Sequence, residues 1–94
     1  MSQDDSTDAG QGTSTEDEER RALELIRIRY GLTNREFDVL RLTAAGHTQK
    51  GMANELYLSV NSVSTYVKAL HAKLGVHSKQ EIIDLVQRTR VERK

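Results

Sequence analysis

Hydrophobic residues between Ser59 and Gly75 recur at the spacing of one face of an α-helix. They are separated by three, four, three and four residues, and they are Val60, Val63, Val67, Leu70 and Leu74. This spacing gathers the apolar side chains into one narrow stripe that can pack on a core. The hydroxyl of Ser59 can accept a hydrogen bond from a free N–H of the first turn, and Gly75 suits the left-handed residue that follows a helix. The pattern therefore predicts a capped helix over residues 60–74.

The opposite face of this predicted helix is polar and holds no acidic residue. Its members are Asn61, Ser62, Ser64, Thr65 and Lys68. A helix with one buried stripe and an acid-free polar face can rest on a core and enter a DNA groove, although an ordinary amphipathic surface helix has the same pattern. The neighbouring segments decide between these two interpretations.

The segment of residues 15–30 has an apolar face as well. Acidic residues occupy its opening turn, where the helix dipole favours them, and Gly31 ends it. The apolar residues are Ala22, Leu23, Leu25, Ile26 and Ile28. Because this face is broad for a short helix, we expect the helix to pack on the rest of the domain or on a second subunit.

Thr33 and Glu36 have the spacing of a capping box, which predicts that a second helix begins here. Phe37 is the only Phe in the chain, and we expect it at the centre of the core. Gly46 ends this helix, and Thr48 is the predicted N-cap of a short third helix. The residues of the third helix that we expect to face inward are Met52, Ala53 and Leu56. A helix of about two turns, a tight turn and a longer helix form the helix-turn-helix layout.

Ser78 and Glu81 repeat the capping-box spacing and predict a last helix. The apolar surface of this helix is too wide for one packing partner. It consists of Ile82, Ile83, Leu85 and Val86. We therefore predict a symmetric dimer whose contact is formed by Ile82, Ile83 and Val86.

Charge divides the chain into two parts. Residues 1–19 hold seven acidic residues and no base, whereas residues 20–94 hold all 14 bases and the other seven acids. The formal net charge of zero thus hides an acidic part of −7 and a basic domain of +7. A basic domain favours polyanionic partners such as nucleic acid. Residues 1–14 contain no large apolar residue after Met1, so we expect a disordered acidic tail there.

Features missing from the sequence argue against several classes of protein. The chain has no Cys, and its three histidines are scattered, so we expect neither a metal site nor a cofactor. No nucleophile with a base, Gly-rich phosphate loop or pair of carboxylates is visible, so we expect no enzyme. No apolar run approaches ~18 residues and no signal peptide is apparent, which predicts no membrane span and a cytoplasmic location. Pro is absent and β-branched residues do not alternate, which favours an all-α fold.

Several stretches of the chain share their spacing with one known family. They are Leu32-Thr33-x-Arg35-Glu36, Val39-Leu40-x-Leu42-x-Ala44-Ala45-Gly46-His47-Thr48, Met52-Ala53-x-x-Leu56 and Lys73-Leu74-Gly75-Val76-x-Ser78, together with Ser59, Val63 and Val67. Over residues 32–87 the chain resembles the DNA-binding domain of LuxR-type regulators, also called the NarL/FixJ type. The resemblance implies a four-helix helix-turn-helix domain that regulates transcription. We place this domain at residues 32–90, with an extra N-terminal helix at residues 15–31.

The resemblance also implies how the chain contacts double-stranded DNA. It makes residues 60–74 the recognition helix in the major groove, and it makes the last helix the contact of a homodimer. The positions that correspond to groove-facing residues are Ser64, Thr65 and Lys68. The positions that correspond to contacts with backbone phosphates are Thr48, Gln49 and Lys50. Asn61, near the start of the recognition helix, lies where it reaches a phosphate or a base.

The chain departs from the family pattern in two stretches. Gly51 stands where the family usually has Glu, so the capping box that Thr48 begins is incomplete. The family usually has a Thr-Val-Lys-x-His run, and here Ser64 and Tyr66 replace the Lys and the His. Lys68 is then the main cation of the groove-facing side, and we expect Tyr66 to pack at the edge of the core rather than stack on a base.

Two other functions fit parts of the sequence. A promoter-recognition module similar to region 4 of sigma factors shares the Leu-Thr-x-Arg-Glu opening and acts bound to RNA polymerase, but the run from Lys73 to Val76 argues against it. A protein-interaction module without DNA binding would pair with another regulator through residues 82–86. Retention of the chain on DNA, and its dependence on salt, distinguishes these classes.

Overall fold

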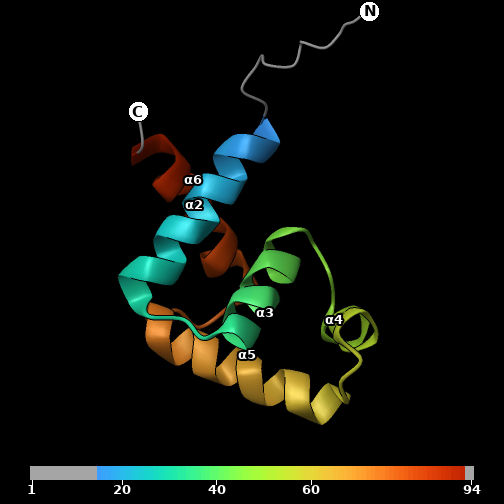
Figure 1. The fold of residues 1–94 in the computed structure, drawn as a ribbon. Coiled ribbons are helices and arrows are strands. Elements are labelled where there is room, and N and C mark those ends of the chain that lie inside the picture. Colours follow the sequence, from blue (N-terminus) through green and yellow to red (C-terminus); the bar gives the residue numbers. More distant parts are fainter. Residues whose placement is uncertain (1–14, 93–94) are drawn as a thin grey trace, which may run out of the picture.

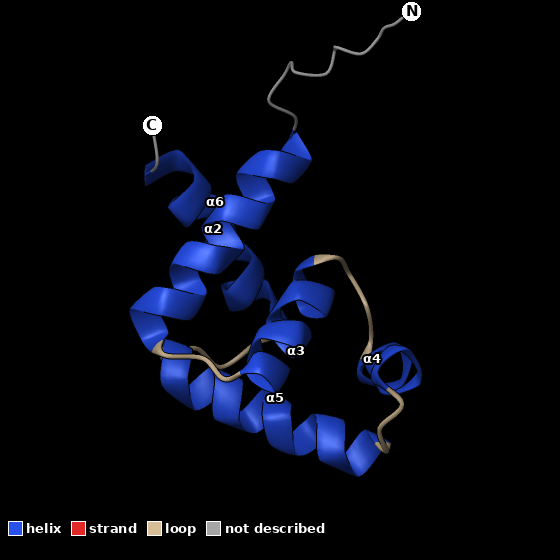
Figure 2. Ribbon diagram, viewed as in Figure 1, coloured by secondary structure: helices blue, strands red, loops and turns tan. Residues whose placement is uncertain are grey.

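Five α-helices form the part of the chain that the computed structural model describes, residues 15–92, and this part contains no strand (Figure 2). The helices are α2 (Thr15–Tyr30), α3 (Asn34–Ala44), α4 (Gln49–Leu56), α5 (Val60–Leu74) and α6 (Lys79–Glu92). The predicted all-α fold is therefore confirmed for these residues. The acidic tail predicted over residues 1–14 lies outside them.

Helix α3 lies in the middle of the molecule and contacts each of the other four helices. On one side of it α2 and α6 pack against each other, and on the other side α4 and α5 pack together (Figure 1). Helix α5 runs along the lower edge of the view in Figure 1, and no other helix lies below it. This arrangement supports α5 from one side and leaves its outer side open.

One hydrophobic cluster joins all five helices. Its largest fully buried apolar side chains are Ile26, Leu40, Leu70, Ile82, Val39 and Val63. Residues of α2 and residues of α5 belong to the same cluster, so the first helix shares its core with the helix-turn-helix.

The predicted helix ends are confirmed by their hydrogen bonds. Thr33 and Glu36 form a complete capping box at the start of α3. The Ser59 hydroxyl accepts from the N–H of Ser62 at 3.0 Å, and Gly75 closes α5 in the left-handed conformation with φ 70°. These interactions are local, which explains why the sequence alone predicts them.

Three apolar residues lie elsewhere than predicted. Phe37 is only partly buried at the edge of the core, where the Arg27 guanidinium lies 5.1 Å from the centre of its ring. Ile28 is 76% exposed because it follows Ile26 by two residues and so points to the opposite side of α2. Val60 is 48% exposed because it is the first residue of α5 and reaches beyond the end of the core.

The prediction of a free apolar face on α6 is wrong. Ile82 and Val86 are 1% and 2% exposed, because α6 packs against both α2 and α3. Near the end of α6, Arg90 Nη2 lies 3.3 Å from Glu18 Oε1 at the start of α2, so the two helices run antiparallel. Ile83 is half-buried and keeps part of its surface exposed. The predicted second partner of α6 is thus a helix of the same chain.

Candidate nucleic-acid interface

The N-terminus of α4 presents free backbone N–H groups beside a cation. Thr48 caps this helix by accepting from the N–H of Gly51 at 3.0 Å. Gln49 and Lys50 follow in the first turn, both exposed, and this turn holds no acidic residue. The free N–H groups and the positive end of the helix dipole favour an anion such as a phosphate at this position.

The outer side of α5 is polar and open. Asn61, Thr65 and Lys68 are exposed and Ser64 is half-buried, whereas Val63, Leu70 and Leu74 on the other side are buried. The Thr65 hydroxyl donates to the Asn61 carbonyl at 3.1 Å, which leaves its oxygen free to accept. None of the 15 residues of α5 is acidic. A face of this kind suits the edges of bases and the negative charge of DNA.

A half-open hollow of about 310 Å³ separates the start of α4 from the middle of α5. Thr48, His71 and Lys79 are among the residues that line it. The Lys79 ammonium group donates to the carbonyls of Gly46 and His47 at 3.4 and 3.3 Å, directly before α4. A cation from α6 thus lies close to the α4 N-terminus, although Lys79 is about 30 residues away in sequence and no local pattern points to it.

The turn between α4 and α5 is tight, and one of its residues has the left-handed backbone conformation. Tyr57 has φ 57° and ψ 44°, and its N–H donates to the carbonyl of Ala53. Ala53 is buried, and its small side chain allows α4 and α5 to approach closely.

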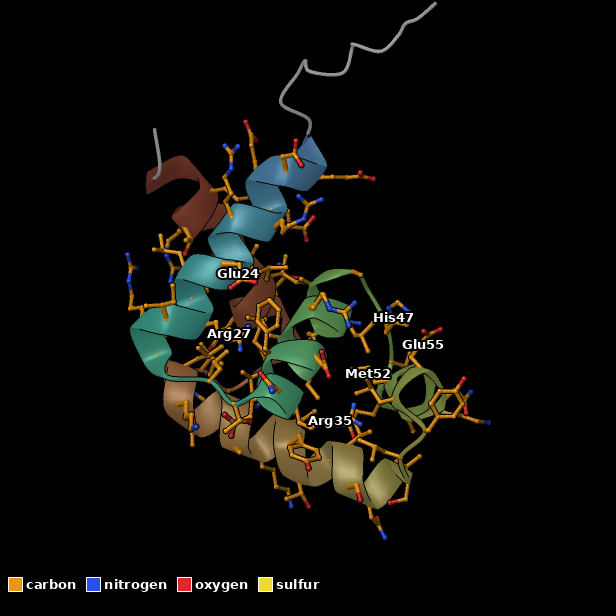
Figure 3. All side chains as sticks on the ribbon, in the orientation of Figure 1. Glu24, Arg27, Arg35, His47, Met52 and Glu55 are labelled. Carbon is orange, nitrogen blue, oxygen red and sulfur yellow. The ribbon has the colours of Figure 1, made fainter. Side chains whose placement is uncertain are left out.

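Met52 also points inward, toward α3 (Figure 3), where the Thr43 hydroxyl donates to its sulfur at 3.6 Å. Tyr66 is partly buried against the core, which agrees with the predicted packing at its edge.

An ion pair anchors the last turn of α5 to the start of α3. Lys73 Nζ lies 2.7 Å from Glu36 Oε1 and 3.1 Å from the carbonyl oxygen of Gly31. The N–H of Thr33 donates to the same Glu36 oxygen at 2.9 Å. Burial raises the pKa of the Glu36 carboxyl, but the hydrogen bonds from Lys73 and Thr33, together with the charge of Lys73, outweigh it. The pKa therefore lies below its ordinary value of 4.5.

We expect the contribution of this ion pair to stability to depend on pH. Because the pKa of Glu36 is lower in the folded than in the unfolded chain, the unfolded chain binds more protons between the two pKa values. The stabilisation is complete above about pH 4.5 and is lost as the pH falls through the folded pKa. Replacing Lys73 by Met leaves a buried carboxylate without its partner, and should lower the free energy of unfolding at pH 7 by about 1–3 kcal/mol.

Urea unfolding of the wild type and of Lys73→Met between neutral and acidic pH checks this prediction. The difference between the two proteins should be largest near pH 7 and shrink as the pH falls toward and below 4.5. Lys68→Met is the matched control, because Lys68 is exposed and forms no ion pair with another described residue. A difference that stays constant with pH would contradict the role given to Glu36.

The start of α4 can be stabilised by one substitution. Gly51 occupies the third helical position, and a Cβ built there meets its nearest atom, the Thr48 hydroxyl oxygen, at 3.4 Å, an ordinary contact. Gly51→Glu would remove a glycine from the helix and complete the capping box. We expect the free energy of unfolding to rise by about 1 kcal/mol. The midpoint of urea unfolding measures this change in stability. Gly51→Ala is the control, because it removes the glycine without completing the capping box. A midpoint of Gly51→Glu below the wild-type value would contradict the prediction.

Within residues 15–92, no group of three His, Cys, Asp or Glu side chains could hold a metal ion. The helices of this part of the chain are also too short or too polar to cross a membrane.

The packed pair of α4 and α5, joined by a tight turn with Tyr57 in the left-handed conformation and supported by α3, defines a helix-turn-helix protein. The family described as "Bacterial regulatory proteins, luxR family" matches residues 31–86, which is more than half of the chain. The chain therefore belongs to the luxR family of bacterial regulatory proteins.

Curated relatives of the chain carry the names of transcription regulators. A protein of Pseudomonas aeruginosa with such a name is 40% identical over 72 residues, which cover 77% of this chain and 32% of that protein. BvgA of Bordetella pertussis, named for the regulation of virulence factors, is 46% identical over 57 residues, 61% of this chain and 27% of BvgA. The HTH-type transcriptional regulator MalT of Yersinia pestis is 40% identical over 65 residues, 69% of this chain and 7% of MalT.

The chain thus spans less than a third of the length of each of these relatives. No solved structure matches the chain.

Proposed function

We propose that the chain is a transcription regulator that binds double-stranded DNA in a sequence-specific manner, with α5 in the major groove. The open, polar and acid-free outer side of α5 carries this proposal. The family match and the names of the relatives support it. Because chromosomal DNA of bacteria lies in the cytoplasm, a cytoplasmic location belongs to the proposal.

Each site residue has a role in this proposal. Lys68 is the long donor for a guanine edge, and Ser64 and Thr65 supply short donors and acceptors one turn before it. Asn61 reaches a base or a phosphate at the start of α5. The contacts to a backbone phosphate come from Thr48, Gln49 and Lys50. Phosphate contacts set the position of the protein on DNA, and base contacts select the sequence.

We also propose that two copies bind paired half-sites about one helical turn apart. The pairing cannot use Ile82 and Val86, because both side chains are buried within the chain itself. The contact would have to include the exposed part of Ile83 and the polar side of α6. RNA polymerase or a second regulator is a further partner that this function allows. The division into residues 1–14, 15–31 and 32–90 is part of the same proposal.

The two alternatives have less support. The luxR-family match favours a regulator over a sigma-type promoter module. A protein-interaction module that uses residues 82–86 would need an exposed apolar face, and three of the four apolar residues of that face are buried.

Selection from a random pool of duplexes, followed by binding titrations, tests the proposal. The enriched duplex should bind at least about tenfold more tightly than a scrambled one, and the logarithm of the affinity should fall linearly with the logarithm of the salt concentration. If no sequence is enriched, the claim of sequence-specific binding is wrong. If no duplex is retained even at low salt, the proposal of DNA binding itself is wrong.

A further inference from the structure

Tyr57 has a backbone conformation that its side chain disfavours. It is the only non-glycine residue with positive φ in the part of the chain that the structure describes. The other three positive-φ positions are occupied by glycine, at Gly31, Gly46 and Gly75. A large L-residue is less stable than Gly or Asn in this left-handed region. If the fold alone selected the residue at position 57, a small residue would serve it better.

The side chain of Tyr57 contributes nothing to the fold that offsets this cost. It is 94% exposed, more than any other large hydrophobic residue of the described part. Its hydroxyl forms no hydrogen bond with another described residue. A side chain that is strained, exposed and unpartnered within its own domain is expected where it meets a partner outside the domain.

The surroundings of Tyr57 favour DNA as this partner. Tyr57 lies two residues before Ser59, the N-cap of α5, and it is followed by the exposed Val60 and Asn61. Helix α5 has no acidic residue. The only acidic residue of α4 is Glu55, which projects from the side of α4 that faces away from α5 (Figure 3). No carboxylate of α4 or α5 therefore stands between the start of α5 and a DNA strand beside it.

We propose that Tyr57 contacts the DNA backbone next to the start of α5. Its ring packs on a deoxyribose, and its hydroxyl donates a hydrogen bond to a phosphate oxygen. This inference rests on the proposed function. It assigns a phosphate contact to the turn, at the opposite end of α4 from Thr48 and Lys50, so that both ends of α4 would contact the backbone.

A neutral backbone contact has a recognisable signature in binding experiments. It carries no sequence information, so its loss weakens enriched and scrambled duplexes by the same factor. It neutralises no phosphate charge, so its loss leaves the slope of log affinity against log salt unchanged. A lysine that contacts a phosphate would change that slope.

The test compares Tyr57→Gly and Tyr57→Phe with the wild type on both duplexes at several salt concentrations. Tyr57→Gly should raise Tm by roughly 4 °C, because the strain is removed, and weaken both duplexes about tenfold at an unchanged salt slope. Tyr57→Phe keeps the ring and should show a smaller loss of affinity. Ile28→Ala is the control, because Ile28 is exposed on α2 and lies outside the proposed interface. Nitration of Tyr57 by tetranitromethane should be slowed by bound DNA.

Four results would overturn the inference. An unchanged affinity of Tyr57→Gly, or equal nitration with and without DNA, would show that Tyr57 does not contact DNA. A Tm of Tyr57→Gly below the wild-type value would show that the side chain serves the fold. If the wild type binds neither duplex, the proposed function fails and this inference fails with it. If the wild type binds DNA and one of the other three results is found, only the inference about Tyr57 is wrong.

Discussion

Replacing Leu70 by Ala should lower the free energy of unfolding by about 2–5 kcal/mol. Leu70 is completely buried and belongs to the stripe by which α5 packs on the core. The substitution removes apolar contacts and leaves a cavity that the surrounding helices fill only in part. Small domains are stable by about 5–15 kcal/mol, so this is a large share of the total.

Urea unfolding of Leu70→Ala measures the loss. Val60→Ala is the matched control on the same helix, because Val60 is 48% exposed and should cost less than about 1 kcal/mol. A loss below about 1 kcal/mol for Leu70→Ala would mean that the side of α5 assigned to the core, and with it the side assigned to DNA, is wrong.

Lys68→Ala and Lys50→Ala should weaken DNA binding in two different ways. Lys68 is exposed on the outer side of α5, one turn after Ser64, where a long donor reaches a guanine. Its loss should cost about 1–3 kcal/mol on the enriched duplex and relax the choice of base at one position. Lys50 lies in the first turn of α4, beside the expected phosphate. Its loss should weaken all duplexes alike and reduce the salt slope by about one per subunit.

Titrations of both variants on enriched and scrambled duplexes at several salt concentrations measure these effects. Arg21→Ala is the control for the loss of one positive charge, because Arg21 is exposed on α2, outside the proposed contacts with DNA. If Lys68→Ala weakens the scrambled duplex as much as the enriched one, Lys68 is a phosphate contact and does not select sequence. If neither lysine matters, the interface is elsewhere.

Features that depend on neighbours in sequence could be predicted. The caps at Thr33, Thr48 and Ser59 are formed by a hydroxyl and an N–H three residues later, so the sequence contains the whole interaction. The buried stripe of α5 follows from helical periodicity, apart from its first residue. The same periodicity assigns the outer side of α5, and therefore the candidate interface.

Features that depend on distant parts of the chain could not be predicted. The apolar face of α6 looks free in the sequence, and only the packing of α6 against α2 and α3 shows that Ile82 and Val86 are covered. Lys73 and Glu36 are 37 residues apart, and no local pattern pairs them. The sequence predicts Phe37 at the centre of the core because it is the only Phe, but it is only partly buried there, and the Arg27 guanidinium of α2 lies over its ring.

The turn between α4 and α5 could be predicted only in part. Its position between α4 and α5 follows from the sequence, but the left-handed conformation of Tyr57 does not, because left-handed positions favour glycine and the sequence has a tyrosine there. The sequence feature that points to a special role of this position is a large aromatic residue in a tight turn.

The central claim is that the outer side of α5 and the start of α4 face DNA. Backbone amide chemical shifts of the isotope-labelled chain, followed during titration with the enriched duplex, test it most directly. We predict that the largest changes fall on residues 48–50 and on the exposed positions from Tyr57 to Lys68, with small changes on α2. Changes confined to α2 and α6, or no changes at saturating duplex, would contradict the claim.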